Sequence, residues 1–381
     1  MFVSFNKPYL AGNELEYIRQ ACAGGHLSGN GPFTQKCEGW LRQKTGAKGA
    51  FLTSSGTDAL EMAAILAGIG PGDEIIMPSY TFVSSANAFV LRGGVPVFVD
   101  IRPDTLNLDE KKIAEAITPR TKAILVVHYA GVACEMDAVL EIARTHDLLV
   151  IEDAAQGIGS RYRGKPLGSL GHLAAFSFHE TKNIISGEGG ALLVNDARLL
   201  ERAEMVWEKG TDRSQFLQGL VDKYTWRDIG SSFAPGELTT AFLWAQMESF
   251  DFIMEKRMEL WKNYHRFLQP AEEKNLLRRS SYPDGTTHNA HLYFILLPDA
   301  GKRGPFLKSL NEKGINAVFH YVPLHDSPGG QKYGRVHGAM TVTEDLSGRI
   351  VRLPLWVGMT TEQDRVIEVV LDESKKLFEA H

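Results

Sequence analysis

One lysine, Lys182, stands where a side chain could do covalent chemistry. It follows an apolar segment, residues 174–178, and precedes a glycine-rich turn and a second apolar segment, residues 191–194. A lysine there does not serve the core of a sheet, because burying an unpaired ammonium group is costly. Its place predicts a side chain reaching into a cleft at a strand end, where pyridoxal phosphate (PLP) enzymes hold the lysine that forms a Schiff base with the cofactor aldehyde. Taken alone, the pattern also fits an exposed loop lysine.

A carboxylate, Asp153, ends the apolar segment of residues 148–152, upstream of Lys182. A PLP enzyme needs an acid beside its pyridine nitrogen. The paired charge keeps that nitrogen protonated, and the protonated ring accepts electrons from a substrate carbanion. By itself, this pattern also fits a carboxylate that caps the next turn.

Small residues, Ser55, Gly56 and Thr57, open a segment with the apolar periodicity of a helix, residues 58–67. Backbone N–H groups and the helix dipole favour an anion at such a helix start, which suits a cofactor phosphate. An ordinary Ser/Thr helix cap is the alternative. The three features occur in the order that a PLP site requires, and together they favour that interpretation.

The first half of the chain alternates apolar strands with helical segments, which predicts an α/β fold with a mostly parallel sheet covered on both faces. Ligands bind such sheets at the carboxyl ends of the strands, where the candidate residues lie. The predicted strands are residues 49–52, 74–77, 96–100, 123–128, 148–152, 174–178 and 191–194; the predicted helices are residues 58–67, 83–92, 109–117 and 136–146.

The rest of the chain predicts a second, smaller α/β unit. We expect a helix over residues 196–207, a long functional or interface loop over residues 210–231, and a long helical stretch over residues 236–268 that links the two units. A chain of 381 residues is long enough for two domains, which we place at 1–245 (large, PLP-binding) and 246–381 (small, C-terminal). The predicted elements of the small domain are strands at residues 292–297 and 317–321 and helices at residues 306–313 and 361–378.

Motifs along nearly the whole chain resemble the DegT/DnrJ/EryC1/StrS family of sugar aminotransferases. This resemblance implies an aspartate aminotransferase-like fold (PLP fold type I), PLP as the cofactor, and a homodimer with shared active sites. The motifs that carry it are residues 55–57, 78–82, 127–131, 152–156, 176–179, 182–183 and 187–190.

The resemblance also implies roles for individual residues. Lys182 would anchor the cofactor and then act as general acid and base, while Asp153 would contact the pyridine nitrogen. The phosphate would lie against Gly56, Thr57 and Ser177, the ring against Phe82, and the ring oxygen near Gln156. In this family the other subunit completes the phosphate site, commonly with an asparagine. By register this position is Thr225 here, a departure that leaves the contact open.

Within the family, the chain most resembles the transaminases that form dTDP-4-amino-4,6-dideoxygalactose for enterobacterial common antigen. This implies dTDP-4-keto-6-deoxyglucose as acceptor and glutamate as amino donor. The substrate-binding candidates are Tyr129, Lys223, Tyr321 and His325. Another nucleotide-sugar aminotransferase, acting at C4 in the glucose series or at C3, is the alternative.

Other functional classes fit less well. Sugar dehydratases of this fold carry histidine in place of the Schiff-base lysine, and no G-x-G-x-x-G motif follows the first strand to indicate a nicotinamide dehydrogenase. A non-catalytic PLP-binding module would not need both Lys182 and Asp153. His320 and His325 have no carboxylate or cysteine at a spacing that would complete a set of metal ligands, so we predict no metal site.

Composition indicates an ordinary soluble protein. A net charge of −5 argues against a nucleic-acid surface, and no apolar run is long enough for a membrane span. The N-terminus lacks a signal-peptide core, and the three scattered cysteines indicate reduced thiols, so we expect a cytoplasmic protein. Cys134 lies near a possible substrate loop, but packing is its expected role.

Overall fold

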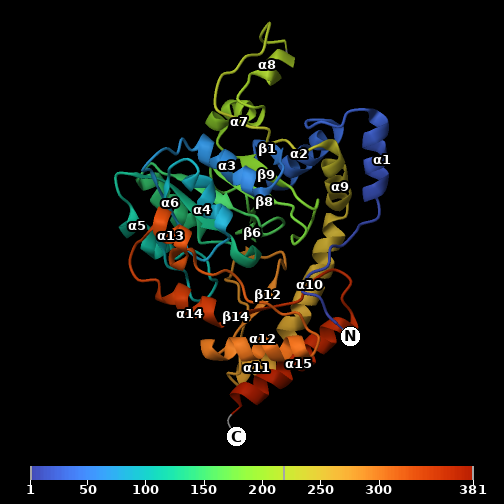
Figure 1. The fold of residues 1–381 in the computed structure, drawn as a ribbon, viewed down its shortest axis with the longest axis vertical. Coiled ribbons are helices and arrows are strands. Elements are labelled where there is room, and N and C mark those ends of the chain that lie inside the picture. Colours follow the sequence, from blue (N-terminus) through green and yellow to red (C-terminus); the bar gives the residue numbers. More distant parts are fainter. Residues whose placement is uncertain (1, 218, 380–381) are drawn as a thin grey trace.

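The computed structural model describes residues 2–217 and 219–379, built around a central eight-stranded sheet in the order β1-β9-β8-β5-β4-β2-β3-β13 (Figure 1). Neighbouring strands are parallel from β8 to β13, whereas β9 runs antiparallel to β1 and β8. The strands are β1 (Gly49–Thr53), β2 (Glu74–Pro78), β3 (Val95–Val99), β4 (Thr121–Val127), β5 (Leu149–Asp153), β8 (Leu173–Ser177), β9 (Gly190–Val194) and β13 (Arg335–Val336).

The seven strands predicted in the first half of the chain are confirmed, and the sheet is mostly parallel as expected. The eighth, β13, comes from the C-terminal part and pairs with β3. A strand of only two residues is too short to leave a periodic signal in the sequence, so β13 was not predicted. A small separate sheet contains β6 (Arg161–Tyr162), β7 (Lys165–Pro166) and β11 (Thr286–Thr287).

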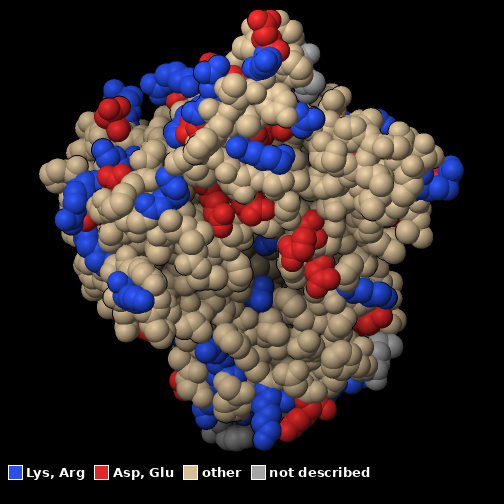
Figure 2. Space-filling model, turned by 45° about the horizontal axis from the view of Figure 1, so that its top comes forward, with Lys and Arg blue, Asp and Glu red and all other residues tan. Residues whose placement is uncertain are grey.

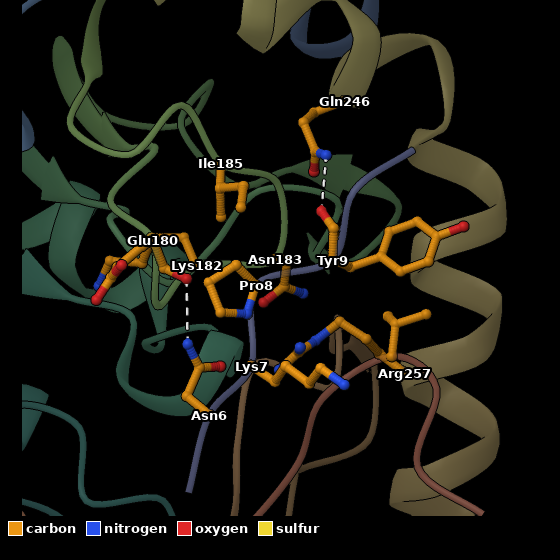
Figure 3. Close-up of a pocket in the computed structure, with 11 residues that line it drawn as sticks. Asn6, Lys7, Pro8, Tyr9, Glu180, Lys182, Asn183, Ile185, Gln246 and Arg257 are labelled. Atoms are coloured by element: carbon orange, nitrogen blue, oxygen red, sulfur yellow. Dashed lines mark hydrogen bonds between the residues drawn. The ribbon is translucent and has the colours of Figure 1, made fainter. Parts of the chain in front are cut away.

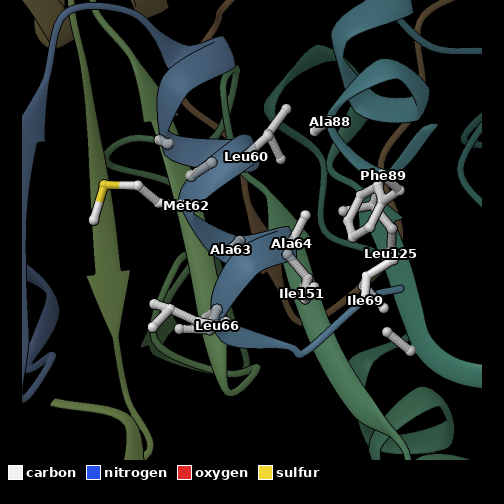
Figure 4. Packing of buried hydrophobic residues seen from close by; sticks show 14 of the residues in the cluster. Leu60, Met62, Ala63, Ala64, Leu66, Ile69, Ala88, Phe89, Leu125 and Ile151 are labelled. Atoms are coloured by element: carbon white, nitrogen blue, oxygen red, sulfur yellow. The ribbon is translucent and has the colours of Figure 1, made fainter. Parts of the chain in front are cut away.

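Helix α3 covers one face of the sheet and brings its own N-terminus to the strand ends. The side chain of Ser55 caps it by accepting a hydrogen bond from the N–H of Asp58. Its apolar residues pack with Leu125 of β4 and Ile151 of β5 in one buried cluster (Figure 4). The helices of this part are α1 (Glu14–Gly24), α2 (Pro32–Thr45), α3 (Gly56–Leu66), α4 (Val83–Val90), α5 (Ile113–Ala116), α6 (Met136–Thr145) and α7 (Leu200–Trp207).

The segment after α7 projects from the body of the molecule at the top of Figure 1 and contains the short helix α8 (Arg213–Leu217). It exposes large apolar side chains, and Trp226 is 83% exposed. The segment was predicted as a long polar and aromatic loop, so α8 is an addition to that prediction.

One sequence prediction for the C-terminal part is wrong and another gains detail. The predicted helical stretch of residues 236–268 is helical but is divided at Ser249 into α9 (Glu237–Glu248) and α10 (Phe250–Phe267). Residues 317–321 form no strand, because only Val318 bridges to Arg352 before the chain turns to bring His320 and Tyr321 to a cavity.

The remaining elements surround a three-stranded antiparallel sheet in the lower half of Figure 1. Its strands are β10 (Arg278–Arg279), β12 (Tyr293–Leu296) and β14 (Ile350–Leu353). The helices here are α11 (Gln269–Glu273), α12 (Arg303–Glu312), α14 (Thr341–Arg349) and α15 (Thr361–Phe378), whereas α13 (Pro328–Tyr333) lies beside β3 of the central sheet.

The N-terminal segment, residues 2–9, runs beside this lower half of the molecule. The next helices in the chain, α1 and α2, lie in the upper half (Figure 1). Val3 bridges to Ile315 and belongs to the apolar cluster formed mainly by residues of α10, β12, β14 and α15. The domain division at residue 245 therefore stays a prediction. Among the residues described, no helix is long and apolar enough to cross a membrane.

Candidate active site

A cavity of about 1010 Å³ opens at the carboxyl ends of β5 and β8. It reaches β14 of the three-stranded sheet formed by β10, β12 and β14. Figure 2 shows a hollow in the middle of one face, with lysine or arginine side chains inside it and acidic side chains along its rim. Eight of the residues predicted from the sequence line this cavity. They are Gly56, Thr57, Phe82, Asp153, Gln156, Ser177, Lys182 and Tyr321.

Lys182 lies in the turn between β8 and β9, where its backbone N–H donates to the carbonyl of His179 at 2.9 Å. Its side chain is half-buried and faces the cavity. Burial lowers the pKa of the ammonium from its ordinary 10.5 to about 8; Asp153 opposes this effect and Arg352 adds to it. The neutral amine, which is the nucleophilic form, is thus accessible near neutral pH.

Asp153 ends β5 with its carboxylate at the cavity. Oδ2 accepts a hydrogen bond from the hydroxyl of Ser85 at 2.6 Å, and Oδ1 accepts one from the N–H of Ala155 at 3.2 Å. Asp153 as a whole is 6% exposed. These contacts fix its direction, because one donor is a hydroxyl on α4 and the other is a backbone N–H just after β5, and the carboxylate keeps acceptor capacity for a further cationic N–H group.

The preceding residue, Glu152, shows why Asp153 reaches the cavity. Successive strand residues point to opposite faces of a sheet. Glu152 accepts hydrogen bonds from His128 Nε2 and from the N–H groups of Gly168, Leu170 and Gly171. All four contacts lie on the face of the sheet opposite the cavity. Glu152 therefore holds the local structure together, whereas Asp153 is left to face the cavity.

The N-terminus of α3 forms a cradle of small residues together with β8. The first N–H groups of a helix have no partner inside it, and here they face the cavity at Gly56 and Thr57. A Cβ added at Gly56 would lie 2.9 Å from the Cβ of Ser177, so a larger residue would fill the cradle. The hydroxyl of Thr57 shares a hydrogen bond with that of Ser84 at 2.7 Å. Such a donor set fits a phosphate group.

Aromatic side chains form the cavity wall between the cradle and the sheet of β10, β12 and β14. Phe82, the residue before α4, is 56% exposed despite its apolar ring, and its ring centroid lies 6.3 Å from that of Tyr321. Gln156 Nε2 donates to the hydroxyl of Tyr321 at 3.1 Å, while its Oε1 accepts from the N–H of Ala130 at 2.7 Å. Gln156 is thus held at the edge of the cavity.

These residues fit a planar, phosphate-bearing aldehyde cofactor. They offer a cradle for its phosphate, an amine of lowered pKa for its aldehyde, a carboxylate for a ring nitrogen, and an exposed aromatic ring, Phe82, for its face. Among the described residues, no group of three or more His, Cys, Asp or Glu side chains is arranged to hold a metal ion.

The sequence profile of the DegT/DnrJ/EryC1/StrS aminotransferase family matches residues 8–371. The chain belongs to this family. GDP-perosamine synthase of Caulobacter vibrioides is 35% identical over 374 residues, which cover 96% of each chain. The structure also superposes on PseC of Helicobacter pylori, an aminotransferase in the biosynthesis of pseudoaminic acid, with a TM-score of 0.90 and 26% identity over 99% of this chain and 100% of that one.

The PLP form of the putative sugar aminotransferase Spr1654 of Streptococcus pneumoniae shares the fold, with a TM-score of 0.90 at 22% identity and coverage of 99% of this chain and 100% of that one. The family match confirms the predicted family and, with it, PLP as the cofactor, and the superpositions confirm the aspartate aminotransferase-like fold. The cavity lined by the eight predicted residues is called the aminotransferase cavity below.

Four predicted residues lie outside the cavity lining. Tyr129 is fully buried behind it, where its hydroxyl shares a 2.7 Å hydrogen bond with His320 Nδ1. His325 is also buried and contacts the hydroxyl of Ser79 at 2.7 Å. Lys223 and Thr225 lie on the projecting segment, where the N–H of Thr225 donates to Asp212. Their assigned roles stay predictions.

The aminotransferase cavity also contains residues that were not predicted as site residues. Arg257 of α10, His291, His320 and Arg352 of β14 all line it. A signal for Arg352 existed in the sequence, since it is a lone cation in the apolar segment Ile350–Leu353. No comparable signal marked the others.

The N-terminal segment forms another unpredicted wall, beside Lys182 (Figure 3). Asn6 Nδ2 donates to the carbonyl of Glu180 at 3.2 Å, and Gln246 Nε2 donates to the carbonyl of Tyr9 at 2.9 Å. These contacts tie the segment to the turn that carries Lys182 and to α9.

Proposed function

We propose that this protein is a nucleotide-sugar aminotransferase that converts the C4 keto group of a 4-keto-6-deoxy sugar to an amine. One observation carries the proposal: a lysine whose pKa is lowered to about 8 shares a cavity with an oriented carboxylate, Asp153. When bound, PLP supplies an electron sink for the carbon that loses its proton.

The chain's own residues bind the cofactor and move the protons. Lys182 would hold the cofactor, and its neutral amine would take a proton from the amine-bearing carbon of the donor and deliver it, on the same face of the cavity, to the carbon that the cofactor aldehyde supplies. Asp153 keeps a proton on the ring nitrogen, and Ser85 holds that carboxylate in place. The cradle at Gly56, with Thr57 and Ser177, retains the phosphate through both halves of the reaction.

The first candidate acceptor is dTDP-4-keto-6-deoxy-D-glucose, with L-glutamate as donor and dTDP-4-amino-4,6-dideoxy-D-galactose as product, for enterobacterial common antigen or another surface polysaccharide. The resemblance of several segments to such transaminases supports this choice. Tyr321, at the cavity wall, is a candidate sugar contact. Lys223 and His325 remain candidates for the nucleotide part.

A second candidate acceptor is a GDP-linked sugar. The curated relative at 35% identity is named GDP-perosamine synthase, and perosamine is a 4-amino-4,6-dideoxymannose. Both candidates have the same reacting group, a 4-keto-6-deoxyhexose, and differ in the nucleotide and in the configuration of the ring.

The active unit is, in this proposal, a cytoplasmic homodimer with shared active sites. The projecting segment exposes Trp226, Tyr224 and Leu220, as a segment seated on another subunit would. Lys223 and Thr225 would then reach the partner's cavity and complete its phosphate and nucleotide contacts.

The test is incubation of the holoenzyme with glutamate and each keto sugar nucleotide in turn, with the product analysed by NMR. An axial C4 amine from the dTDP substrate supports the galactose-series assignment. An equatorial C4 amine on a GDP-linked 4,6-dideoxymannose supports the second candidate, and amination at C3 would overturn both. A protein that binds PLP but aminates neither sugar nor any related keto sugar nucleotide would be a non-catalytic module.

A further inference from the structure

Two buried asparagines, Asn183 and Asn289, lie behind the wall of the aminotransferase cavity. They are 5% and 4% exposed, and neither lines that cavity itself. Asn183 follows Lys182 in the chain, in the turn that Figure 3 shows from close by. Asparagine is seldom this buried unless hydrogen bonds satisfy its amide. The partners of the two amides therefore indicate what these residues hold in place.

Asn183 joins the turn that carries Lys182 to the distant segment 288–291. Its Nδ2 donates to the backbone carbonyl of Asn289 at 2.8 Å. A carbonyl can only accept, so this contact orients the amide and turns Oδ1 to His291 Nδ1, 2.9 Å away. Burial, together with the charge of Lys182, lowers the pKa of His291 well below its ordinary 6.5, so the ring is neutral and its Nδ1–H donates to Asn183. The Lys182 turn is thus tied to the segment at two points.

Asn289 joins the same segment to the loop that follows β5. Its Nδ2 donates to the carbonyls of Gln156 and Ile158, each at 2.8 Å, and so uses both of its hydrogens. Its Oδ1 accepts from the N–H of His291 at 3.0 Å. A Cβ built on Gly131 would overlap this oxygen, so the amide is enclosed on that side too. The backbone of Gln156, whose side chain lines the cavity, is thereby fixed to the segment.

The segment itself has a strained backbone. Ala290 has a φ of 51°, in the left-handed region that residues with a Cβ rarely adopt. Such a conformation persists only where the surroundings hold it. Here Arg257 of α10 holds it by donating to the carbonyl of Ala290 at 3.1 Å and to that of His291 at 2.6 Å. The turn at Ala290 lies between Asn289, which contacts both loops, and His291, which lines the cavity.

The central sheet does not fix the two loops by itself. The pairing of β5 with β8 ends at Asp153 and Ala175, whereas Gln156 and Lys182 lie beyond it. We propose that Asn183 and Asn289 are positioning residues that hold Lys182 and Gln156 in one fixed frame, an inference that rests on the proposed aminotransferase function. In that function Lys182 moves a proton at a carbon of the bound molecules, and a small displacement of its amine slows such a step.

A purely structural role for a buried amide is the alternative, and Asn195 provides the matched control. Its Nδ2 also donates to two carbonyls, those of Gly168 at 3.0 Å and Gly171 at 2.8 Å. None of these three residues lines the aminotransferase cavity. Asn195→Ala therefore removes the same kind of contact without touching the Lys182 turn.

The test measures the pKa of Lys182 in the cofactor-free, full-length protein. The readout is the pH dependence of labelling by an amine-reactive reagent, followed by mass spectrometry of the peptide that contains Lys182. Wild-type Lys182 should titrate near pH 8, because burial lowers the pKa of its amine. In Asn289→Ala the turn is released and water reaches the amine, so we expect this pKa to rise by about one pH unit toward its ordinary 10.5. Asp153 and Arg352, the charged groups that also act on this pKa, are present in every variant.

Asn183→Ala is the second variant, and it serves even if Asn289→Ala fails to fold. It releases the Lys182 turn but leaves the contacts of Asn289 with Gln156 and Ile158. Because the two asparagines act in series, the double variant should shift the pKa of Lys182 no further than the larger single shift. Independent effects would add, and additive shifts would overturn the common frame.

The half-reaction of the holoenzyme with glutamate gives a further readout. Both single variants should lower its maximal rate by up to about 100-fold, because the amine is misplaced. The glutamate concentration for the half-maximal rate should change less than about threefold, because the groups that bind the donor remain. A purely structural loss would lower thermal stability without this division between rate and binding.

A pKa of Lys182 within about 0.3 of wild type in both single variants would overturn the inference. An equal rise in Asn195→Ala would do so as well, because the effect would then follow from general loss of stability. The proposed function fails separately, since the titration of Lys182 needs no turnover. A wild-type holoenzyme that accepts no amino group from any amino acid would refute the aminotransferase activity itself.

Discussion

Replacing Asp153 with asparagine separates the charge of this residue from its shape. The substitution keeps an oxygen that can accept from the N–H of Ala155, but it removes the negative charge that Ser85 orients at 2.6 Å. A charge-assisted hydrogen bond to the ring nitrogen is lost in a buried site, and such losses typically raise a barrier by about 3–4 kcal/mol. Each 1.36 kcal/mol is about a factor of ten in rate, so we expect a loss of roughly two to three decades.

The assay is stopped-flow absorbance of the holoenzyme mixed with glutamate, which reports one half of the reaction. Ser85→Ala is the graded comparison, because it keeps the carboxylate but frees its orientation; we expect a loss of about tenfold or less. Since Asp153 raises the pKa of the free Lys182 amine, this lysine should titrate below about pH 8 in the cofactor-free asparagine variant. A variant of unchanged thermal stability that reacts within twofold of wild type would refute the electrostatic role.

Further predictions concern the cofactor and the assembly. The rate at which PLP re-binds covalently to the cofactor-free protein should rise with pH and level off above about pH 8, because only the neutral Lys182 amine attacks; a plateau that begins near pH 10.5 would contradict the lowered pKa. Gly56→Ala should weaken PLP binding about tenfold in a titration, because the new Cβ meets Ser177, whereas Gly24→Ala, with nothing within 4 Å, should not; equal affinities would disprove the cradle. Mixing Lys182→Ala chains with chains inactivated at Lys223 should restore roughly a quarter of the activity under random pairing, and no recovery after verified subunit exchange would mean that each chain builds its own site.

The sequence predicted those parts of the site that depend on local order along a parallel sheet. Apolar strands followed by Asp153 or by the turn to Lys182 place both side chains at one edge, because the carboxyl ends of parallel strands meet there. The cradle at Gly56 follows from the same rule, since a helix starts where β1 ends.

The parts that depend on distant segments were not predictable in this way. Arg352 lines the same cavity as Asp153 and Lys182 although β14 lies far along the chain from both, and Phe5 contacts it only because the N-terminal segment crosses to the C-terminal part. Residues 317–321 have the composition of a strand, yet tertiary contacts of His320 with Tyr129 hold them against the cavity instead. The break at Ser249 has no proline or glycine to announce it.

Borohydride reduction of the purified protein, followed by peptide mapping, tests the central claim most directly. The account predicts a yellow protein in which reduction fixes one cofactor per chain to the peptide that contains Lys182, while Lys182→Ala is neither labelled nor able to aminate a keto sugar nucleotide. Cofactor fixed to a different lysine would contradict the account.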